Sequence, residues 1–584
     1  MKKLTVALLL ILCAVLCIFS FTSCSKKKKG TVTEAPPATT DKWEPLGAEI
    51  KAYSADDRTL RIQMSAYGDA EKTSRNDKYI EGPDEDAVNK KKTDTIGKLI
   101  WERNTRANQV FGTTVQYIYW DETDLGWGKQ AGKIVELVQA ADPQAPDMYI
   151  DMLYDLNKAM LSKGVFKDVW SLPGSYFDFS ADGWMTEWME SLSFTGDRAY
   201  ILGSDYFIDF FRNMGVLPFN AALMDENGSK LAKALFGEDL ADGETMSQRF
   251  FDYVEEGKWT WASLKKLCEA IWVDNAPTDQ DSLNDTLGII IEAYSGMPAT
   301  IALYSTGESL TEVKTVNGVQ TISYPDEPGA LKEIFNAISD VFKGNGSFVT
   351  NVQGGGSTED KPGIGYHYIK FAENTLLFTD PSLLGTLEDD VFQQMMQHYL
   401  YSVVPLPKLS EYKMDGSDYG LDAAGEKIPL KYNTVIHNTA DVGAISVRTT
   451  GGKARVLSAY MQFCAENSGA VRKEYLEVVT KFKTTDYNQG TDRMLDLIYD
   501  SVITARDKAL DDAIDCLEGG REVRFHQKLK GGDAPFENDA SFIASEYTKI
   551  ISTKSSLLGQ VLTTWRNLPT GDTVPADLDA TEGE

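Results

Sequence analysis

The chain is poor in cysteine and histidine, and this scarcity argues against two kinds of site. It has six cysteines, three of them within the first 24 residues. The other three, Cys268, Cys464 and Cys516, are widely spaced and odd in number, so we expect no disulfide framework. The four histidines are scattered and no CxxC pair occurs. A zinc site is therefore poorly supported.

The sequence also lacks the common catalytic fingerprints and an excess of positive charge. No GxSxG, HExxH, P-loop or dinucleotide motif occurs. The 58 basic residues are outnumbered by 87 acidic ones, for a formal charge of -29. Nucleic-acid binding needs basic patches, so no nucleic-acid partner is expected. We expect that the protein is not an enzyme. A surface glycoside hydrolase is the alternative, but such an enzyme is defined by two carboxyl groups at a fixed separation, and acidic residues are too frequent here for their presence to identify it.

A long apolar run occurs at the N-terminus. Residues 4–21, LTVALLLILCAVLCIFSF, follow Lys2 and Lys3, and this pattern is typical of a secretory signal. The run ends in Phe-Thr-Ser-Cys, which resembles the bacterial lipobox with Phe21 where leucine is usual. We expect residues 1–23 to be removed and Cys24 to carry a lipid. An uncleaved membrane anchor is the alternative, and either one places the chain outside the cytoplasm.

The segments at the two ends of the mature chain predict little packed structure. SKKKKG and TVTEAPPATT follow Cys24. The lysines suit anionic lipid headgroups, and the Thr/Pro/Ala stretch cannot build a core. We therefore expect a lipidated flexible tether over residues 24–56. The acidic, polar stretch 569–584 is expected to be a disordered tail.

Between these ends, strand and helix patterns alternate. Strand-like runs are predicted at 59–66, 113–120 and 147–152, with helical patterns at 95–110 and 129–140 between them. This order predicts an α/β fold with a parallel sheet and crossover helices. Further strands are predicted at 287–293, 371–378 and 401–406, and helices at 453–466, 468–482, 491–502 and 540–566. The chain is too long for one core and should form two lobes.

Seven segments, in this order, resemble one protein family. They are GVFKDVW at 164–170, DRAYILGSDYF at 197–207, GVLPFNAALMDENG at 215–228, EEGKWTWASLKKLCEAI at 255–271, SVVPLPKL at 402–409, AYMQFCAEN at 459–467 and RMLDLIYDSV at 493–502. Together with the lipoprotein start, they make the chain similar to the extracellular solute-binding proteins of carbohydrate-type ABC transporters, the group related to maltose-binding protein.

The resemblance implies a two-lobed, type II periplasmic-binding-protein-like fold, each lobe a mostly parallel sheet flanked by helices, with extra C-terminal helices. The first lobe is expected over 57–165 and 370–440, and the second over 166–369 and 441–568. The family implies a carbohydrate held between the lobes and delivery to ABC transporter permease subunits. No cofactor is implied. The expected state is a monomer on the extracytoplasmic face of the cell membrane. A non-sugar solute, such as a peptide or polyamine, stays open as the ligand.

The candidate ligand-binding residues come from one geometric rule. Open α/β sheets bind ligands beyond the carboxyl ends of their strands, and sugars require polar groups for their hydroxyls and aromatic rings for their C–H faces. The Trp120–Trp127 loop is the best single patch, although its tryptophans could instead pack under their own lobe. Asp151 could instead cap a helix, whereas Trp259 and Trp261 are expected to pack at a helix start. The rule selects Tyr67, Asp69, Trp120, Asp124, Trp127, Asp151 and Tyr154 in the first lobe, and Asp205, Tyr206, Tyr294, Tyr366 and His367 in the second.

A weak calcium motif precedes the strand at 287–293. Residues 274–286 read DNAPTDQDSLNDT and offer the carboxylates of Asp274, Asp279, Asp281 and Asp285. A calcium loop needs a tight turn that converges several oxygens, and the central glycine for that turn is missing. We therefore expect a solvated acidic loop and no metal.

Overall fold

The computed structural model describes most of the chain from residue 41 onward. The described residues are 41–65, 77–120, 128–275, 284–293, 295–316, 319–350, 365–388, 400–412, 429–480, 485–503, 506–531, 536–575 and 578. Residues 45–584 form one compact unit, and the description that follows concerns this unit. The lipid candidate Cys24 lies outside the described residues.

The first sheet has the strand order β2-β1-β3-β12. β1 runs parallel to β2 and β3, whereas β12 runs antiparallel to β3. The strands are β1 (Thr59–Ser65), β2 (Thr114–Trp120), β3 (Met148–Met152) and β12 (Asp441–Ile445). The helices of this lobe are η1 (Asp77–Glu81), α2 (Trp43–Ile50), α3 (Glu85–Asn89), α4 (Thr95–Phe111), α5 (Gln130–Gln139), α6 (Leu153–Lys163), α7 (Thr186–Ser191), α8 (Ile208–Arg212) and α17 (Gly451–Glu466). The predicted strands and crossover helices are confirmed to within a residue or two.

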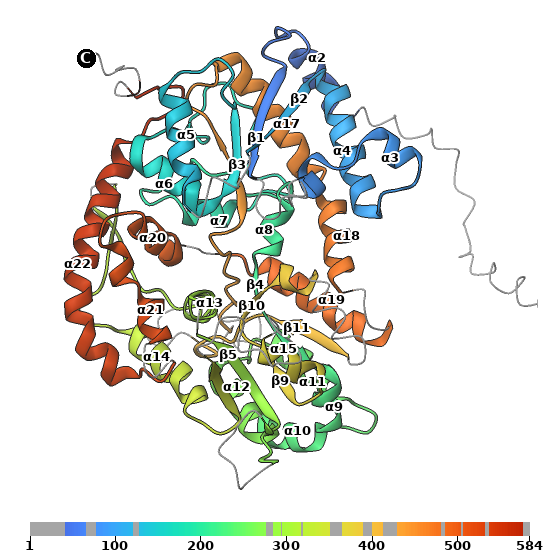
Figure 1. The fold of residues 1–584 in the computed structure, drawn as a ribbon, viewed down its shortest axis with the longest axis vertical. Helices are drawn as coiled ribbons and strands as arrows, with labels where there is room; N and C mark the ends of the chain where they lie inside the picture. The colour runs from blue at the N-terminus through green and yellow to red at the C-terminus, as the bar shows by residue number, and fades with distance from the viewer. Residues whose placement is uncertain are drawn as a thin grey trace, which may run out of the picture. The chain divides into compact units, whose positions relative to one another are not determined.

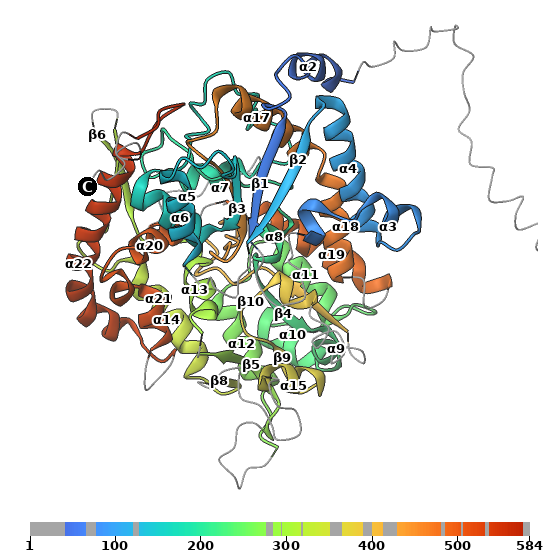
Figure 2. The same cartoon turned by 45° about the horizontal axis from the view of Figure 1, so that its top comes forward.

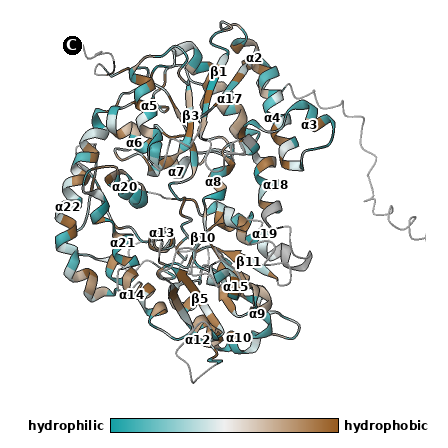
Figure 3. Ribbon diagram, viewed as in Figure 1, coloured by the Kyte–Doolittle hydropathy of each residue, from teal (hydrophilic) through white to brown (hydrophobic). Residues whose placement is uncertain are grey.

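The second sheet has the strand order β10-β4-β9-β5-β8, and β11 also pairs with β4. β5 runs parallel to β8 and β9, and β4 runs antiparallel to β9. The strands are β4 (Gly215–Asn220), β5 (Leu287–Glu292), β8 (Ser347–Thr350), β9 (Leu376–Phe378), β10 (Ser382–Leu383) and β11 (Tyr401–Val404). A separate hairpin pairs β6 (Glu312–Val316) with β7 (Val319–Ser323). β5 is hydrophobic along most of its length (Figure 3), as expected for a strand covered on both faces.

Helices cover the second sheet and place its strands. α12 begins where Thr260 accepts a hydrogen bond from the Ser263 backbone N–H at 3.3 Å, which is a standard N-cap. Trp259 and Trp261, on either side of this cap, are buried as expected. The helices are α9 (Ala221–Glu226), α10 (Gly228–Phe236), α11 (Met246–Glu255), α12 (Trp261–Ile271), α13 (Met297–Tyr304), α14 (Ala330–Phe342), α15 (Tyr366–Ala372) and η5 (Leu384–Glu388).

The two sheets are built on the same plan. Each has three parallel strands, followed by an antiparallel strand that the chain contributes on its way from the other lobe. β4 enters the second sheet directly after α8, and β12 returns to the first sheet after β11. The two crossing segments pair with each other: the Gly215 N–H donates to the Val435 carbonyl at 2.8 Å and the His437 N–H to the Asn213 carbonyl at 3.0 Å. This exchange of strands defines the two-lobed, type II binding-protein-like class and confirms the predicted fold (Figure 1).

The sheet order corrects the predicted lobe boundaries. Residues 370–440 were expected in the first lobe, but β9, β10 and β11 lie in the second sheet. Residues 441–568 were expected in the second lobe, but β12 lies in the first sheet and α17 packs on α4 and β1. The predicted strand at 371–378 is instead the end of α15 followed by the three residues of β9. Short strands carry no local signal of which sheet they join, and the resemblance placed the return crossing too early.

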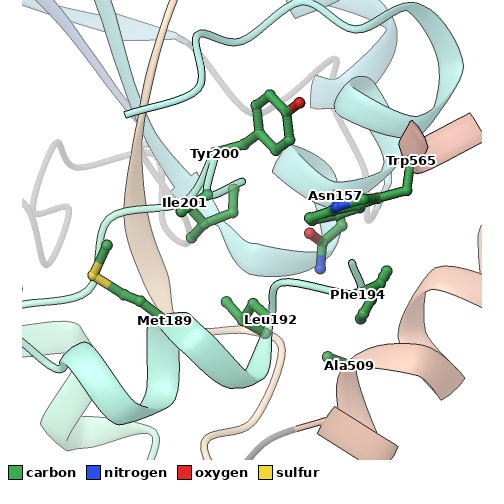
Figure 4. Close-up of a pocket in the computed structure, with 9 residues that line it drawn as sticks. Asn157, Met189, Leu192, Phe194, Tyr200, Ile201, Ala509 and Trp565 are labelled. Atoms are coloured by element: carbon green, nitrogen blue, oxygen red, sulfur yellow. The ribbon is translucent and has the colours of Figure 1, made fainter. Parts of the chain in front are cut away.

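The C-terminal helices connect the two lobes. They are α18 (Gly469–Thr480), α19 (Thr485–Asp500), α20 (Arg506–Asp515), η7 (Gly520–Val523), α21 (Phe525–Lys530) and α22 (Ala540–Asn567). α22 packs on α14 of the second lobe, whereas its Trp565 contacts the rings of Phe194 and Tyr200 of the first lobe. Both views show α22 running along one side of the molecule (Figures 1 and 2). Where Trp565 and Ala509 meet the first lobe, they enclose a void of only about 10 Å³ (Figure 4).

Both expected flexible ends are partly packed. Residues 43–50 form α2, and the Tyr176 hydroxyl donates to Glu49, so the tether prediction is wrong for that part. At the other end, the Tyr200 hydroxyl donates to the Pro569 carbonyl at 2.8 Å, and Lys167 pairs with Asp572 at 3.1 Å. The disordered-tail prediction is therefore wrong for residues 569–572. The prediction used the polar composition of these residues. It failed because the Tyr200 side chain binds a backbone carbonyl of the tail, and composition gives no information on backbone contacts.

A buried ion pair joins α22 to α20. The Lys554 side chain is 0% exposed and pairs with Asp511. The Tyr304 hydroxyl of α13 donates to the same carboxylate, and the Lys554 ammonium lies 4.6 Å from the centre of the Phe525 ring. Three helices from separate parts of the chain thus meet at Asp511. Because Lys554 and Asp511 are both buried, the charge of each is compensated mainly by the other.

We predict that Lys554→Met destabilises the fold by about 3–5 kcal/mol, because it leaves Asp511 as a buried carboxylate without its cation. Urea unfolding followed by circular dichroism measures the change. Lys549→Met is the matched control on the same helix, since Lys549 pairs with Glu546 at the surface and should change stability by at most about 0.5 kcal/mol. Equal losses in the two variants would contradict the importance of the buried pair.

Candidate functional site

The candidate site lies between two facing sheet edges. In the first lobe, the edge consists of the carboxyl ends of β1 to β3 and the start of β12, where Asp441 is opposite Met152. In the second lobe, it consists of the carboxyl ends of β5, β8 and β9 and the start of β4. The crossing segments join these edges, so ligands of an open α/β sheet would bind here. Five predicted residues, Tyr67, Asp69, Asp124, Trp127 and Tyr294, lie outside the described residues.

Trp120 ends β2 at this edge, but its side chain is only 6% exposed. The indole lies 6.0 Å from the Tyr149 ring, measured between centroids. The Lys133 ammonium of α5 lies 4.5 Å above the indole, a cation–π arrangement. The ring therefore packs between its own sheet and α5.

The same face of the first sheet carries buried polar groups. Asp151 is fully buried and accepts from the Gln63 amide at 3.3 Å and from the Met152 N–H at 2.8 Å. Gln63 is in register with Tyr149, and alternate residues of a strand share a face. Tyr154 follows in the first turn of α6, where it is also buried. Carboxylate, amide and phenol groups are thus buried just inside this edge of the first lobe.

Several buried polar atoms of the first sheet and of the neighbouring helix α5 have no hydrogen-bond partner within the part of the chain that the structure describes. They are both amide atoms of Gln130, the Gln63 Oε1 and the Tyr149 hydroxyl. Gln130 is 1% exposed and precedes Lys133 by one helical turn, so the two side chains lie on the same face of α5. Buried polar atoms are normally paired, and such atoms suit ordered water or ligand hydroxyls. Sequence analysis missed Gln130 because no local pattern marks a glutamine as unpaired.

In the second lobe, Tyr366 and His367 begin α15 at the facing edge. His367 is buried, and its Nε2 lies 3.6 Å from an Asp380 oxygen. Asp380 follows β9 and accepts from the Ser382 hydroxyl at 3.0 Å, and burial raises the pKa of its carboxyl. The carboxylate lies between serine and histidine, whereas serine hydrolysis requires the histidine in the middle. This trio therefore lacks the order of a catalytic triad.

Asp205 and Tyr206 lie on the first-lobe side of the hinge, which corrects their predicted place in the second lobe. The preceding Leu202 pairs with Gly443 of β12. Asp205 is 2% exposed and accepts from the Arg472 guanidinium and the Tyr499 hydroxyl, each at 2.9 Å. Burial raises the pKa of Asp205 to about 6, although the Arg472 cation opposes this rise. Tyr206 is fully buried.

A polar cavity of about 230 Å³ lies beside the crossing segments. Its lining includes Tyr304, Glu308, Asn433, Ile436, Arg506 and Lys508. The Asn433 amide donates to the Tyr304 carbonyl at 2.8 Å, which ties the return crossing to α13. Sequence analysis missed this cavity because its walls come from three segments that are far apart in the chain.

The return crossing also carries His437, whose ring nitrogen lies 2.8 Å from the Thr439 hydroxyl. Burial, together with the nearby Lys508 cation, lowers the pKa of His437 to about 3. The imidazole is therefore neutral at physiological pH, so the hinge carries no histidine charge there.

The structure offers little for a metal. Asp285 accepts from the Trp272 indole at 3.3 Å and from the Asn275 N–H at 3.1 Å, so its oxygens serve the turn. Asp279 and Asp281 lie outside the described residues. Across the described ranges, no three His, Cys, Asp or Glu side chains gather in a way that could hold an ion. Within the same ranges, no helix is both long and apolar enough to cross a membrane.

No protein-family model and no curated protein matches the sequence. Among solved structures, the chain is similar to the sugar-binding protein MalE from Xanthomonas citri, with 11% identity, a TM-score of 0.46 and coverage of 86% of this chain and 99% of that chain. It is similar to an ABC transporter solute-binding protein from Thermotoga lettingae bound with α-D-tagatose, with 12% identity, a TM-score of 0.42 and coverage of 85% and 100%.

A third similar structure is the maltose-maltodextrin binding protein of Alicyclobacillus acidocaldarius, with 10% identity, a TM-score of 0.38 and coverage of 85% and 100%. All three are sugar- or solute-binding proteins, the class that the sequence resembles. The two-lobed fold itself rests on the strand order of this chain.

We predict that Gln130→Met stabilises the protein without ligand by about 1–2 kcal/mol, because it replaces a buried amide that has no partner among the described residues with an apolar side chain of similar length. The measurement is urea unfolding. Gln139→Met at the exposed end of α5 is the control and should change little. A loss of more than about 1 kcal/mol in Gln130→Met would show that the amide is bonded, for example to buried water.

Asp205 predicts a pH dependence with a definite sign. Its pKa in the folded chain, about 6, is above the usual 3.8, so the folded state holds the proton more tightly than the unfolded state does. Raising the pH from about 4 to 7 should therefore cost wild type up to about 3 kcal/mol of unfolding free energy relative to Asp205→Asn. Urea unfolding of both proteins across this range measures the difference, and parallel pH profiles would refute it.

Proposed function

We propose that this protein is a ligand-binding lipoprotein that captures a carbohydrate outside the cell and delivers it to an ABC transporter permease. The observation that carries the proposal is the strand exchange between two lobes joined by paired crossing segments. Two lobes on such a hinge can close on a solute between their edges, and contacts made only in the closed form bias the equilibrium.

The chemistry of the facing edges favours a hydroxyl-rich ligand. Buried amide, carboxylate and phenol groups lie along the first-lobe edge, including the unpaired atoms of Gln130. The cavity at the hinge adds a tyrosine, an asparagine and charged groups. Sugars require this mixture of directional polar partners and ring surfaces. We therefore keep Asp151, Tyr154, Tyr366 and His367 at the two edges as the proposed ligand-binding set, without Trp120, whose indole packs inside its own lobe.

The N-terminal residues support a location at the membrane. We propose that residues 1–23 direct export and that a lipid on Cys24 holds the monomer on the extracytoplasmic face of the cell membrane. Four consecutive lysines after Cys24 and Ser25 suit that surface. An anchor of this kind would keep the two lobes close to the permease that receives the ligand.

We expect one carbohydrate in a panel of neutral mono- and oligosaccharides to stabilise the protein by about 2.7 kcal/mol at one hundred times its dissociation constant. Thermal unfolding and calorimetric titration measure binding. Peptides and polyamines in the same panel test the non-sugar alternative. Chromogenic glycosides test the glycoside hydrolase alternative. A panel without any sugar response, or sustained glycoside turnover, would overturn the proposal.

A further inference from the structure

One carboxylate of the second lobe binds three side chains of the first lobe. Glu388 accepts from the Arg212 Nε at 3.0 Å and from the Tyr79 hydroxyl at 3.1 Å. The Tyr475 hydroxyl donates to the same carboxylate. The rings of Tyr79 and Tyr475 meet edge to face, with centroids 5.9 Å apart. Three donors on one largely buried carboxylate make a strong, charge-assisted group of hydrogen bonds.

Glu388 and its partners belong to different lobes. Glu388 ends η5, which follows β10, and β10 pairs with β4 in the second sheet. Tyr79 lies in η1 and Tyr475 in α18, and both elements pack on α4 of the first lobe. Neither tyrosine belongs to a crossing segment, and both are remote from Glu388 in the sequence. The group therefore links the lobes through side chains alone.

Arg212 connects the same carboxylate to the first sheet. Its guanidinium pairs with Asp209 at 3.3 Å, and the other Asp209 oxygen accepts from the Asp441 N–H of β12 at 3.0 Å. Arg212 lies two residues before the crossing at Met214, so its contact with Glu388 is close to the hinge. The tyrosine contacts are the part farther from the crossing segments: η1 packs on α4 and α8, and α18 packs on α4, α19 and η5.

The backbone bonds of the hinge and the bonds to Glu388 respond differently to lobe rotation. The bonds between the paired crossing segments are backbone bonds within the ribbon that joins the lobes, so a rotation of the lobes about that ribbon would leave them intact. The hydroxyl contacts to Glu388 join side-chain tips of different lobes, so the same rotation would separate them. Burial raises the pKa of both tyrosine hydroxyls, with Glu388 adding to the rise. Both hydroxyls therefore stay protonated and able to donate at neutral pH.

We propose that Glu388, held by Tyr79, Tyr475 and Arg212, is a latch that stabilises the lobe arrangement seen in the structure and sets how readily the lobes open. Losing the latch raises the open population before any ligand is added. Ligand affinity then falls, since a smaller fraction of molecules is competent to hold the ligand. The consequence for affinity rests on the proposed function, whereas the consequence for lobe opening does not.

Two variants test the latch. Glu388→Gln removes the charge that all three donors share, and the double variant Tyr79→Phe/Tyr475→Phe keeps both rings while removing two hydrogen bonds. Small-angle scattering of the full mature chain without ligand should show a larger radius of gyration for each variant than for wild type. Glu256→Gln and Tyr253→Phe are matched controls, because their contacts with Lys258 and Ser263 lie within the second lobe. Both controls should scatter as wild type does.

The affinity measurement follows the same variants. For a carbohydrate that binds wild type, Glu388→Gln should raise the dissociation constant roughly tenfold, and the controls should leave it unchanged. If wild type binds no carbohydrate, the proposed function fails while scattering still decides on the latch. If Glu388→Gln does not fold, the tyrosine double variant decides. A natively folded variant that scatters as wild type does would overturn the latch.

Discussion

Backbone pairing between the two crossing segments is the constraint on which the rest of the molecule depends. The Gly215–Val435 and His437–Asn213 hydrogen bonds hold the outgoing and returning chain side by side. Because each segment continues directly into a strand, this pairing fixes where β4 enters the second sheet and where β12 enters the first. The two strands start from one shared ribbon, and the candidate site lies between the sheet edges that this ribbon joins.

Around this ribbon, an acidic chain uses its carboxylates as connectors. Within α20, Asp507 accepts from the Thr311 hydroxyl at 2.6 Å, and Asp511 joins α13 to α22. Asp512 accepts from the Asn438 amide of the return crossing at 2.9 Å. Asp205 and Glu388 play the same part on the α18 side of the hinge. The negative formal charge thus includes buried groups with specific partners, which a count of acidic residues does not distinguish from surface charge.

Local patterns predicted the helices and strands well, because their signals are local. The predicted helix at 95–110 appears as α4, where Asp94 caps the start and Gly112 adopts a left-handed conformation (φ 62°) after the end. Such caps are encoded within a few residues. The predicted strand at 371–378 failed because a three-residue strand behind a helix has too little pattern to read. The lobe boundaries failed for a different reason: the partner of β12 is β3, and nothing near residue 441 in the sequence names it.

The site was less predictable than the fold. Carboxyl ends of strands placed Asp151 and Tyr154 at the edge that faces the second lobe, but did not indicate that Trp120 and His367 are buried. Asp205 was placed in the wrong lobe because the segment before it still belongs to the first lobe, where Leu202 pairs with Gly443 of β12. No local pattern indicates this pairing. The sequence did not predict roles for Gln130, for Glu388 or for the cavity at the hinge. Glu388 and the cavity depend on residues that lie far apart in the chain, and no local pattern indicates that the Gln130 amide has no partner among the described residues.

Strand exchange also has a consequence for how the chain is made. Met152 and Asp441 are paired across β3 and β12, although they are 289 positions apart in the chain. The first sheet therefore cannot be completed until nearly the whole second lobe has emerged from the ribosome, and the second lobe begins with a strand delivered by the first. Contacts of such long sequence separation slow folding. Slow completion of this kind makes the order of synthesis part of the architecture, because the first lobe waits, one strand short, while the second lobe is made.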